Sequence, residues 1–180
     1  FDYIDGGAND EITLADNIAG FRDIVLRQRV MRDVSDIDTS TILSGEKAAM
    51  PVVLAPVGMA GMMARRGETL AVRAANEIGV PFTLSTVGIC DLMEVKGAAS
   101  RPFWFQLYMM RDRGVVQELL ARAESAGCTT LVFTVDLAVT GLRHRDLRNG
   151  ALSSSPRARA VKAWEIARHP RWLLEVALRG

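Results

Sequence analysis

The sequence predicts an α/β fold, and more specifically the first half of a (β/α)8 barrel. Four apolar runs begin near residues 51, 81, 102 and 128, and a helical pattern separates each run from the next. Strands that alternate with helices at intervals of 21 to 30 residues indicate a parallel sheet. The fingerprint GxGxxG of a doubly wound sheet is missing, and polar residues end several strands in succession, which favours the barrel. Because a barrel needs about 250 residues, this chain holds about half of one.

Composition bounds the class of protein. Of the 180 residues, 49% are hydrophobic and 24% are charged, which is typical of a globular protein rather than a disordered one. The net charge of +1 gives no reason to expect nucleic acid as a partner. The charge is uneven, however, because residues 137–180 carry nine Lys or Arg against three Asp or Glu, a net of +6, whereas residues 1–136 carry −5.

The two cysteines give no sign of a disulfide framework or a metal site. Cys90 and Cys128 lie 38 positions apart, without a CxxC motif or a histidine at metal-binding spacing. We therefore expect a reducing, cytoplasmic location. No signal peptide is visible, and no uncharged run of 18 residues could span a membrane. The sequence begins at Phe1 inside a helical pattern, so we expect a fragment of a longer protein.

Residues 1–49 are predicted to form a helical and strap segment that precedes the barrel. FDYIDGG at 1–7 indicates a short helix stopped by paired glycines. Asn9-Asp10-Glu11 then resembles a helix N-cap, and residues 24–43 suggest a small hairpin or strap. The second helix has apolar residues at helical spacing: Leu14, Ile18 and Phe21.

Residues 50–149 are predicted to be the first half of the barrel. The expected strands are 50–57, 81–86, 102–108 and 128–136, and the expected helices are 66–78, 91–99 and 111–126. In the first of these helices, Leu70, Ala74 and Ile78 share a face. In the last, the inward residues are predicted to be Val115, Val116, Leu119, Leu120 and Ala123.

The third strand has two different faces. Alternation in strand 102–108 puts Trp104, Gln106 and Tyr108 on one face. The other face carries Phe103, Phe105 and Leu107. A fully buried parallel strand should be apolar on both faces, so the polar residues at its end predict either a ligand site or groups satisfied by neighbouring loops.

The predicted strand ends offer hydroxyl groups, one carboxamide and one carboxylate. The hydroxyl groups belong to Ser85, Thr86, Tyr108 and Thr134, the carboxamide to Gln106 and the carboxylate to Asp136. A carboxamide donates and accepts hydrogen bonds at once, so Gln106 with Thr134 suits a flat polar ring better than a phosphate. After the fourth strand, Arg143 is a candidate fork for a substrate carboxylate. The alternative for Arg143, Arg145 and Asp146 is a set of weak solvated ion pairs.

Five motifs together resemble a known family. They are YIDGGANDEITLADN (3–17), LAPVGMAGMMARRGE (54–68), PFTLST (81–86), WFQLY (104–108) and TVDLAVTGLRHRD (134–146). By these motifs the chain resembles the FMN-dependent α-hydroxy-acid dehydrogenase and oxidase family, from Tyr3 to at least Asn149. The second motif is closer to the lactate dehydrogenases and LAVTGLR is closer to the mandelate dehydrogenases, so the side chain of the substrate stays undecided.

The resemblance implies an FMN-linked (β/α)8 TIM barrel with FMN across its carboxyl-end face. It implies that Ala55, Pro56 and Val57 supply backbone beside the flavin ring. Ser85, Gln106 and Thr134 become its hydrogen-bond partners, and Tyr3, Tyr108 and Arg143 hold the substrate. Asp136 would support a histidine base that the family carries in a later stretch of the form SNHGGR. This sequence has no such stretch, so we expect the base and the phosphate site of FMN downstream of it.

Residues 150–180 form a basic amphipathic segment with two tryptophans. Periodicity leaves two alternatives open, a helix in a membrane interface or a helix packed on the rest of the protein. The resemblance favours the membrane, because membrane-associated family members carry their membrane-contacting insert after the fourth strand.

The resemblance implies an enzyme that oxidises an (S)-2-hydroxy acid, lactate- or mandelate-like, to the 2-oxo acid. Electrons would pass to a membrane quinone, and the expected location is cytoplasmic and peripheral on the inner face of the cell membrane. One alternative is an oxidase that uses O₂, and another is a non-catalytic half-barrel that binds a partner. We expect no metal, no nucleic acid, and a homo-oligomer for the full-length protein.

Overall fold

The computed structural model describes residues 2–136, 139, 141–149, 153 and 155–178. The chain divides into two compact units. The first unit consists of Phe1–Asp36 with Leu137–His169, and the second consists of Ile37–Asp136 with Pro170–Gly180.

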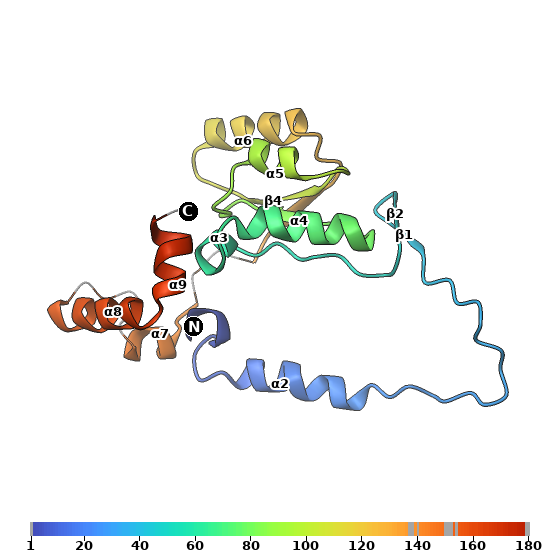
Figure 1. Cartoon of the computed structure of the whole chain (residues 1–180), viewed down its shortest axis with the longest axis horizontal. Helices are drawn as coiled ribbons and strands as arrows, with labels where there is room; N and C mark the ends of the chain where they lie inside the picture. The colour runs from blue at the N-terminus through green and yellow to red at the C-terminus, as the bar shows by residue number, and fades with distance from the viewer. Residues whose placement is uncertain (1, 137–138, 140, 150–152, 154, 179–180) are drawn as a thin grey trace. The chain divides into compact units, whose positions relative to one another are not determined.

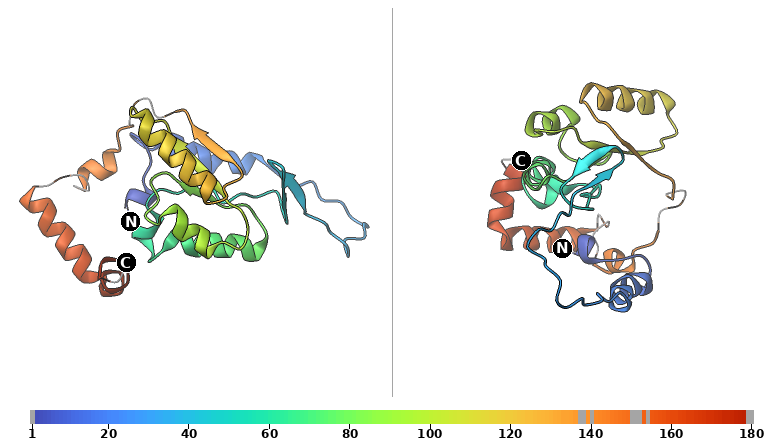
Figure 2. Two further views of the ribbon diagram at one scale, coloured as in Figure 1. Left: turned by 90° about the horizontal axis from the view of Figure 1, so that it is seen from above. Right: turned by 90° about the vertical axis from the view of Figure 1, so that its right-hand side faces the viewer.

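The second unit contains a parallel sheet in the order of the sequence (Figures 1 and 2). Its strands are β3 (Thr83–Ser85), β4 (Trp104–Tyr108) and β5 (Leu131–Thr134). In register, Ser85 pairs with Gln106 and Tyr108 pairs with Thr134. Three of the four predicted strands are thus confirmed.

The predicted first strand, 50–57, is wrong as a full strand. Only Leu54 pairs, through one parallel bridge to Phe82, where its N–H donates to Pro81 O at 2.9 Å and its carbonyl accepts from Thr83 N at 3.0 Å. Prolines at 51 and 56 lack the N–H that a strand ladder needs, so pairing stops on both sides of Leu54.

Three helices connect these strand positions: α4 (Gly67–Ile78), α5 (Leu92–Ala98) and α6 (Arg113–Ser125). The carboxylates of Asp91 and Asp112 cap α5 and α6, because they accept from Met93 N and Gly114 N, both at 2.8 Å. Gly79 ends α4 with φ of 81°, a left-handed conformation that glycine adopts without strain.

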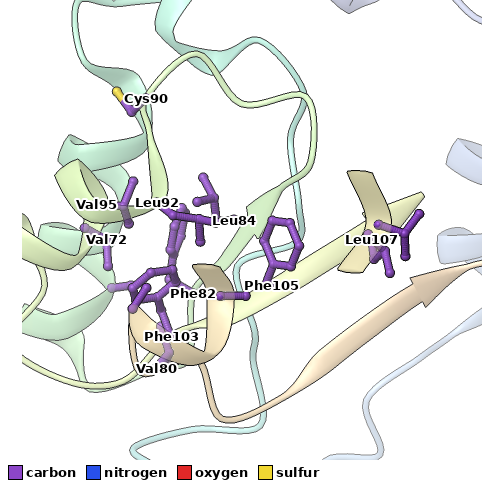
Figure 3. Packing of buried hydrophobic residues seen from close by; sticks show 14 residues of the cluster. Val72, Val80, Phe82, Leu84, Cys90, Leu92, Val95, Phe103, Phe105 and Leu107 are labelled. Atoms are coloured by element: carbon purple, nitrogen blue, oxygen red, sulfur yellow. The ribbon is translucent and has the colours of Figure 1, made fainter. Parts of the chain in front are cut away.

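All three helices pack on one face of the sheet. One cluster of buried residues joins Phe82, Leu84, Phe103, Phe105 and Leu107 of the strand segments to Val72 and Ala75 of α4, Leu92 and Val95 of α5, and Val116 and Ala123 of α6. Figure 3 shows Phe82, Leu84 and Phe103 close to Val72, Leu92 and Val95, with Leu107 further along the sheet. A doubly wound sheet carries helices on both faces, so this arrangement is that of a singly wound sheet. The opposite face carries Ser85, Gln106 and Thr134.

The predicted inner faces of the helices need correction. In α4, Leu70 is 50% exposed and Ile78 is 56% exposed, while Val72 and Ala75 are fully buried. In α6, Val115 and Leu120 are exposed, and Val116 and Ala123 are buried as predicted. Apolar residues occur on two neighbouring stripes of each helix, so periodicity alone could not choose the stripe that meets the sheet.

The hairpin predicted within 24–43 lies further along the chain. Its strands are β1 (Thr41–Leu43) and β2 (Glu46–Ala48), joined by a turn with Gly45 at φ of 83°. It contacts the amino ends of the sheet, because Trp104 Nε1 donates to Glu46 Oε1 at 2.9 Å and Ala49 N donates to Gly79 O at 2.8 Å.

The first unit is helical in its described residues. It contains α1 (Asp2–Asp5), α2 (Ile12–Gly20) with the 3₁₀ turn η1 (Phe21–Asp23), α7 (His144–Arg148) and α8 (Pro156–Arg168). The predicted side-chain cap of α2 is wrong, because its N-cap Glu11 has φ of 63° and makes no capping bond. Ile18 and Phe21 are mostly exposed, so the apolar face expected for this helix is not buried.

The last segment of the second unit packs against an early helix. It consists of α9 (Pro170–Trp172) and the π-helical η2 (Leu173–Leu178), and η2 contacts α3 (Ala60–Met63). Trp172 Nε1 donates to Met62 O at 2.8 Å. The Trp172 side chain is therefore bonded within the second unit, as predicted by the alternative in which this helix packs on the rest of the protein. Trp164 of α8 is 64% exposed.

Candidate functional site

A line of polar side chains crosses the three strands at their carboxyl ends, with Gln106 at its centre. Gln106 Oε1 accepts from Ser85 Oγ and from Thr86 N, both at 3.2 Å. Gln106 Nε2 donates to Thr134 Oγ1 at 2.8 Å. The structure thus brings together the three residues Ser85, Gln106 and Thr134 that the sequence singled out.

Hydrogen bonds with backbone groups fix the positions of these polar side chains. Gln106 is only 1% exposed, although the Thr86 and Thr134 side chains on either side are half-buried. Thr86 Oγ1 donates to the carbonyl oxygen of Gln106 and accepts from Tyr108 N at 3.2 Å. Because the Thr86 N–H can only donate, it must meet the oxygen of the carboxamide, which leaves the NH₂ group toward Thr134.

Loop 55–61 follows the Leu54 bridge at the same edge of the sheet. Val57 is 61% exposed and Ala55 is also exposed, so this loop offers an apolar surface beside the polar line. The loop contacts the next βα loop, because Met59 N donates to Val87 O at 2.9 Å. A Cβ added to Gly58 would lie 2.8 Å from Val87 Cγ2, so the two loops approach closely at that point.

Glu68, in the first turn of α4, is a residue that the sequence reasoning missed. It is 2% exposed, and its Oε1 accepts from Gly61 N at 3.1 Å and from Ile89 N at 2.8 Å. Burial alone raises the pKa of Glu68, but bonds from Ile89, from its own backbone N–H, from the Cys90 thiol and from Gly61 outweigh it, so the pKa lies below the ordinary value. A charged residue on the buried stripe of an amphipathic helix is the signal that could have found it.

Cys90 is the partner of this carboxylate. Burial, followed by the hydrogen bond to Glu68 and its negative charge, raises the pKa of the Cys90 thiol to about 11. The thiol is therefore protonated at neutral pH, so it is not a reactive thiolate.

In the first unit, the motif around residues 3–11 meets the motif around residues 142–146. Arg143 Nη2 donates to Gly6 O at 2.7 Å, and Arg143 Nε lies 2.8 Å from Oδ2 of the buried Asp146. Asn9 and Arg143 also form a parallel bridge. The Arg143 guanidinium is therefore oriented by the backbone of the YIDGG segment and by Asp146.

The neighbouring basic residues Arg145 and His144 contact acidic residues of the same segment. Arg145 reaches both Asp5 and Glu11 at 2.6 Å, and His144 Nδ1 lies 3.0 Å from Asp10 Oδ1. The pKa of Glu11 is lowered, first by its bond from Gly7 N and then by Arg145. Arg145 thus pairs with Asp5 and Glu11, and Asp146 pairs with Arg143, but Asp146 is 2% exposed and is not the solvated group that the ion-pair alternative describes.

Three other residues are predicted to belong to the site: Tyr3, Tyr108 and Asp136. Tyr3 lies in α1, and its side chain falls outside the described part of the structure. Tyr108 ends β4 and is half-buried, while Asp136 follows β5 and is exposed. Tyr3 and Arg143 belong to the first unit, and the Gln106 line, Tyr108 and Asp136 belong to the second.

Two further features of the described residues, their possible metal ligands and a cavity, bear on the type of site. Within residues 2–136 and the described residues beyond them, no cluster of His, Cys, Asp and Glu could hold a metal ion. A cavity of about 350 Å³ lies between α4 and α5 and is lined by Arg65, Arg66, Arg73 and Glu94 among others. It lies on the helices rather than at the strand ends, so it is not the predicted ligand site.

Comparison with known proteins identifies the family. The sequence profile of the FMN-dependent dehydrogenases matches residues 1–179. The chain belongs to the FMN-dependent dehydrogenase family. Its members are oxidoreductases that use FMN, so FMN is the cofactor to test against the site.

Relatives within the FMN-dependent dehydrogenases are close in sequence. Over all 180 residues the chain is 56% identical to L-lactate dehydrogenase of Caulobacter vibrioides (strain NA1000 / CB15N), of which it covers 46%. It is 52% identical to L-lactate dehydrogenase of Vibrio parahaemolyticus, of which it covers 47%. A crystal structure of mandelate oxidase matches 83% of the chain and 43% of its own length, with a TM-score of 0.77 and 39% identity. The chain spans about half the length of these relatives.

The strand-end residues fit a flavin ring. Flavin has a flat apolar body and an edge that carries hydrogen-bond donors and acceptors, and the chain offers an exposed apolar loop at 55–57 beside the Gln106 line. Thr134 uses one of the two N–H donors of the Gln106 carboxamide, which leaves a donor for a ring acceptor. A metal or a free phosphate would need a different set of groups.

Proposed function

We propose that this chain is the N-terminal half of an FMN-dependent enzyme that oxidises an (S)-2-hydroxy acid to the 2-oxo acid. The observation that carries the proposal is the hydrogen-bonded line of Ser85, Gln106 and Thr134 on the face of the sheet opposite the helices. Its donors and acceptors suit a flavin edge, and the chain belongs to a family that uses FMN.

The residues of this chain would bind and orient rather than react. Gln106 Nε2, Ser85 and Thr134 would hold the polar edge of the ring, and the backbone of Ala55, Pro56 and Val57 would lie beside it. When bound, FMN supplies the redox chemistry by accepting the equivalent of a hydride. Exclusion of water from the buried Gln106 strengthens each of these hydrogen bonds.

Arg143, with Tyr3 and Tyr108, would bind the substrate. Arg143 is oriented through Nε by Asp146 and through Nη2 by Gly6 O, and its planar guanidinium has the geometry that suits a carboxylate. Asp136, exposed after β5, would orient a histidine base contributed by a later segment, and that base would take the proton of the hydroxyl group.

A (β/α)8 barrel is the proposed fold of the complete protein. Parallel strands in sequence order, with helices on one face only, are what half of a singly wound barrel requires. Residues 1–49 would be the helical and strap segment, and residues 50–149 the first half of the barrel. The remaining strands would pair with β5, whose Leu131 and Phe133 are about half exposed.

The substrate side chain and the electron acceptor have two candidates. The higher identity to L-lactate dehydrogenases favours lactate and a quinone or another acceptor other than O₂. The structural similarity to mandelate oxidase favours an aromatic hydroxy acid and O₂. We favour the first, with a cytoplasmic enzyme that is peripheral on the inner membrane face and forms a homo-oligomer.

Residues 150–180 would make the membrane contact. Support comes from α8, where Trp164 and Val161 are exposed among basic residues. None of the helices in the described residues is long and apolar enough to cross a bilayer. A peptide of residues 155–180 should bind anionic vesicles more strongly than neutral ones, and Trp164→Ala should weaken it. Equal binding to both vesicles would contradict an electrostatic attachment.

A chimera tests the catalytic proposal. In it, this chain replaces the 180 aligned residues of the Caulobacter vibrioides L-lactate dehydrogenase. The chimera should purify yellow and reduce a quinone analogue when L-lactate is added. Rates with mandelate in place of L-lactate, and with O₂ in place of the quinone analogue, distinguish the two candidate substrates and the two candidate acceptors. A chimera that folds, by circular dichroism and cooperative unfolding, but binds no FMN would refute the proposal and favour a non-catalytic half-barrel.

A further inference from the structure

A single buried carboxylate connects two loops at the carboxyl ends of neighbouring strand positions. The first loop, 57–61, follows the Leu54 bridge and runs into the first two residues of α3, and the second loop, 86–90, follows β3. Glu68 Oε1 accepts from Gly61 N in the first loop at 3.1 Å and from Ile89 N in the second at 2.8 Å. These two bonds, together with Met59 N to Val87 O at 2.9 Å, hold the loops against each other.

Glycines allow the loops to come this close. A Cβ on Gly61 would lie 2.7 Å from Ile89 Cβ, and one on Gly67 would lie 2.5 Å from the Ala60 carbonyl oxygen. Contacts of that length do not occur without a shift of backbone. Gly67 therefore lets α4 begin directly beside α3, which brings the next residue, Glu68, between the two loops.

The cost of burying this charge is met by fixed dipoles rather than by a cation. Glu68 lies in the first turn of α4, where the helix N-terminus stabilises a negative charge, and its Oε1 accepts hydrogen bonds from two loop N–H groups. A hydrogen-bonded buried carboxylate is expensive to lose, because its N–H partners would then stay buried without an acceptor.

Both loops are continuous with residues assigned to the flavin. Val57 begins the first loop, and Ser85 immediately precedes the second, where Val87 N donates to Ser85 Oγ at 3.3 Å. We propose that Glu68 is a positioning residue that locks these two loops together and so sets the place of Val57 and Ser85 against the flavin ring. This inference rests on the proposed function of the strand-end site.

The experiment uses the FMN-free chimera with Glu68 changed to Ala, Asp and Gln. Alanine removes the acceptor, and aspartate keeps the charge but is too short by one methylene to reach both loops. Glutamine keeps an oxygen that can accept from Gly61 N and Ile89 N. The matched control is Glu77→Gln, a change of the same type at an exposed position of the same helix.

The readouts are the Kd for FMN, the visible circular dichroism of bound FMN, and urea unfolding. We expect Glu68→Ala and Glu68→Asp to weaken FMN binding tenfold or more and to alter the dichroism, whereas Glu68→Gln and Glu77→Gln stay within threefold of the parent. If Glu68→Ala does not fold, Glu68→Asp gives the answer. A purely structural residue would lower stability and leave the Kd and the spectrum of the folded protein unchanged.

The inference is overturned if Glu68→Ala or Glu68→Asp binds FMN within twofold of the parent chimera with the same dichroism. It is also overturned if Glu68→Gln is as weak as Glu68→Ala, because the bonds to the loops survive in the glutamine variant. These results differ from failure of the proposed function, in which the parent chimera itself folds and binds no FMN.

Discussion

Replacing Gln106 by methionine should destabilise the fold by an amount that the structure sets. Methionine keeps the length of the side chain but removes the three bonds to Ser85, Thr86 and Thr134. A hydrogen bond contributes about 1 kcal/mol net, so the loss predicts a destabilisation of about 3 kcal/mol. The Thr86 N–H dominates, because the two hydroxyls can rotate toward other partners and a backbone N–H cannot.

The assay is urea unfolding of the FMN-free chimera, followed by circular dichroism. The flavin must be absent because a ligand that binds only the folded state adds its own stabilisation. Thr134→Val is the matched control, since it removes one bond, that from Gln106 Nε2 at 2.8 Å, for about 1 kcal/mol. The double variant should cost about 1 kcal/mol less than the sum of the single ones, because both remove that bond.

A Gln106→Met variant within about 1 kcal/mol of the parent would refute this reasoning. The bonds at 3.2 Å would then contribute nothing measurable, and the polar line would exist for the ligand alone. Strict additivity with Thr134→Val would likewise mean that the two side chains are not coupled.

Three further predictions follow from other parts of the chain. Because the pKa of Glu68 is lowered in the folded state, its contribution is present above its ordinary value of 4.5 and is lost as pH falls below it, so acid unfolding curves of the parent and of Glu68→Gln should converge at low pH. Arg143→Lys in the chimera should lower kcat/KM about tenfold or more, since a lysine loses the planar fork. Asp146→Asn is the control, because it disturbs the orientation of Arg143 without changing Arg143 itself. Unchanged kinetics in Arg143→Lys would mean that Arg143 has a structural role and does not bind the substrate. The isolated chain should self-associate through the β5 edge, where Leu131 is 49% and Phe133 is 47% exposed. Leu131→Lys with Phe133→Lys should reduce association in analytical ultracentrifugation more than Leu26→Lys, a fully exposed control, does.

The polar line could be predicted from the sequence because strand alternation is a local property. Residues two apart share a face, so Gln106 and Tyr108 had to lie opposite Phe105 and Leu107, and the structure confirms this division in its core. The register that brings Ser85 beside Gln106 is seen only in the structure, because parallel direction alone leaves the offset between two strands open.

Other features depend on groups that a side-chain pattern does not contain. Glu68 was missed because its acceptor atom meets backbone N–H groups 7 and 21 residues away, and any sequence carries those N–H groups. The inner stripe of α4 was misplaced because Leu70 and Val72 are equally apolar and only the sheet distinguishes them. The first strand is much shorter than its apolar content predicts, because the prolines at 51 and 56 lack the N–H that a ladder needs.

The orientation of the Gln106 carboxamide is settled by the fold before any ligand arrives. The Thr86 N–H can only donate, so the carboxamide oxygen must face it, and Ser85 Oγ supplies a second donor to the same oxygen. Nε2 is thereby directed to Thr134 Oγ1, and its second N–H remains as a fixed donor. A pre-oriented donor costs a ligand no rearrangement, which favours an acceptor atom on a planar ring over a group that must itself donate. The strand-end site therefore selects the polarity of its ligand through one backbone N–H of the loop that Glu68 secures.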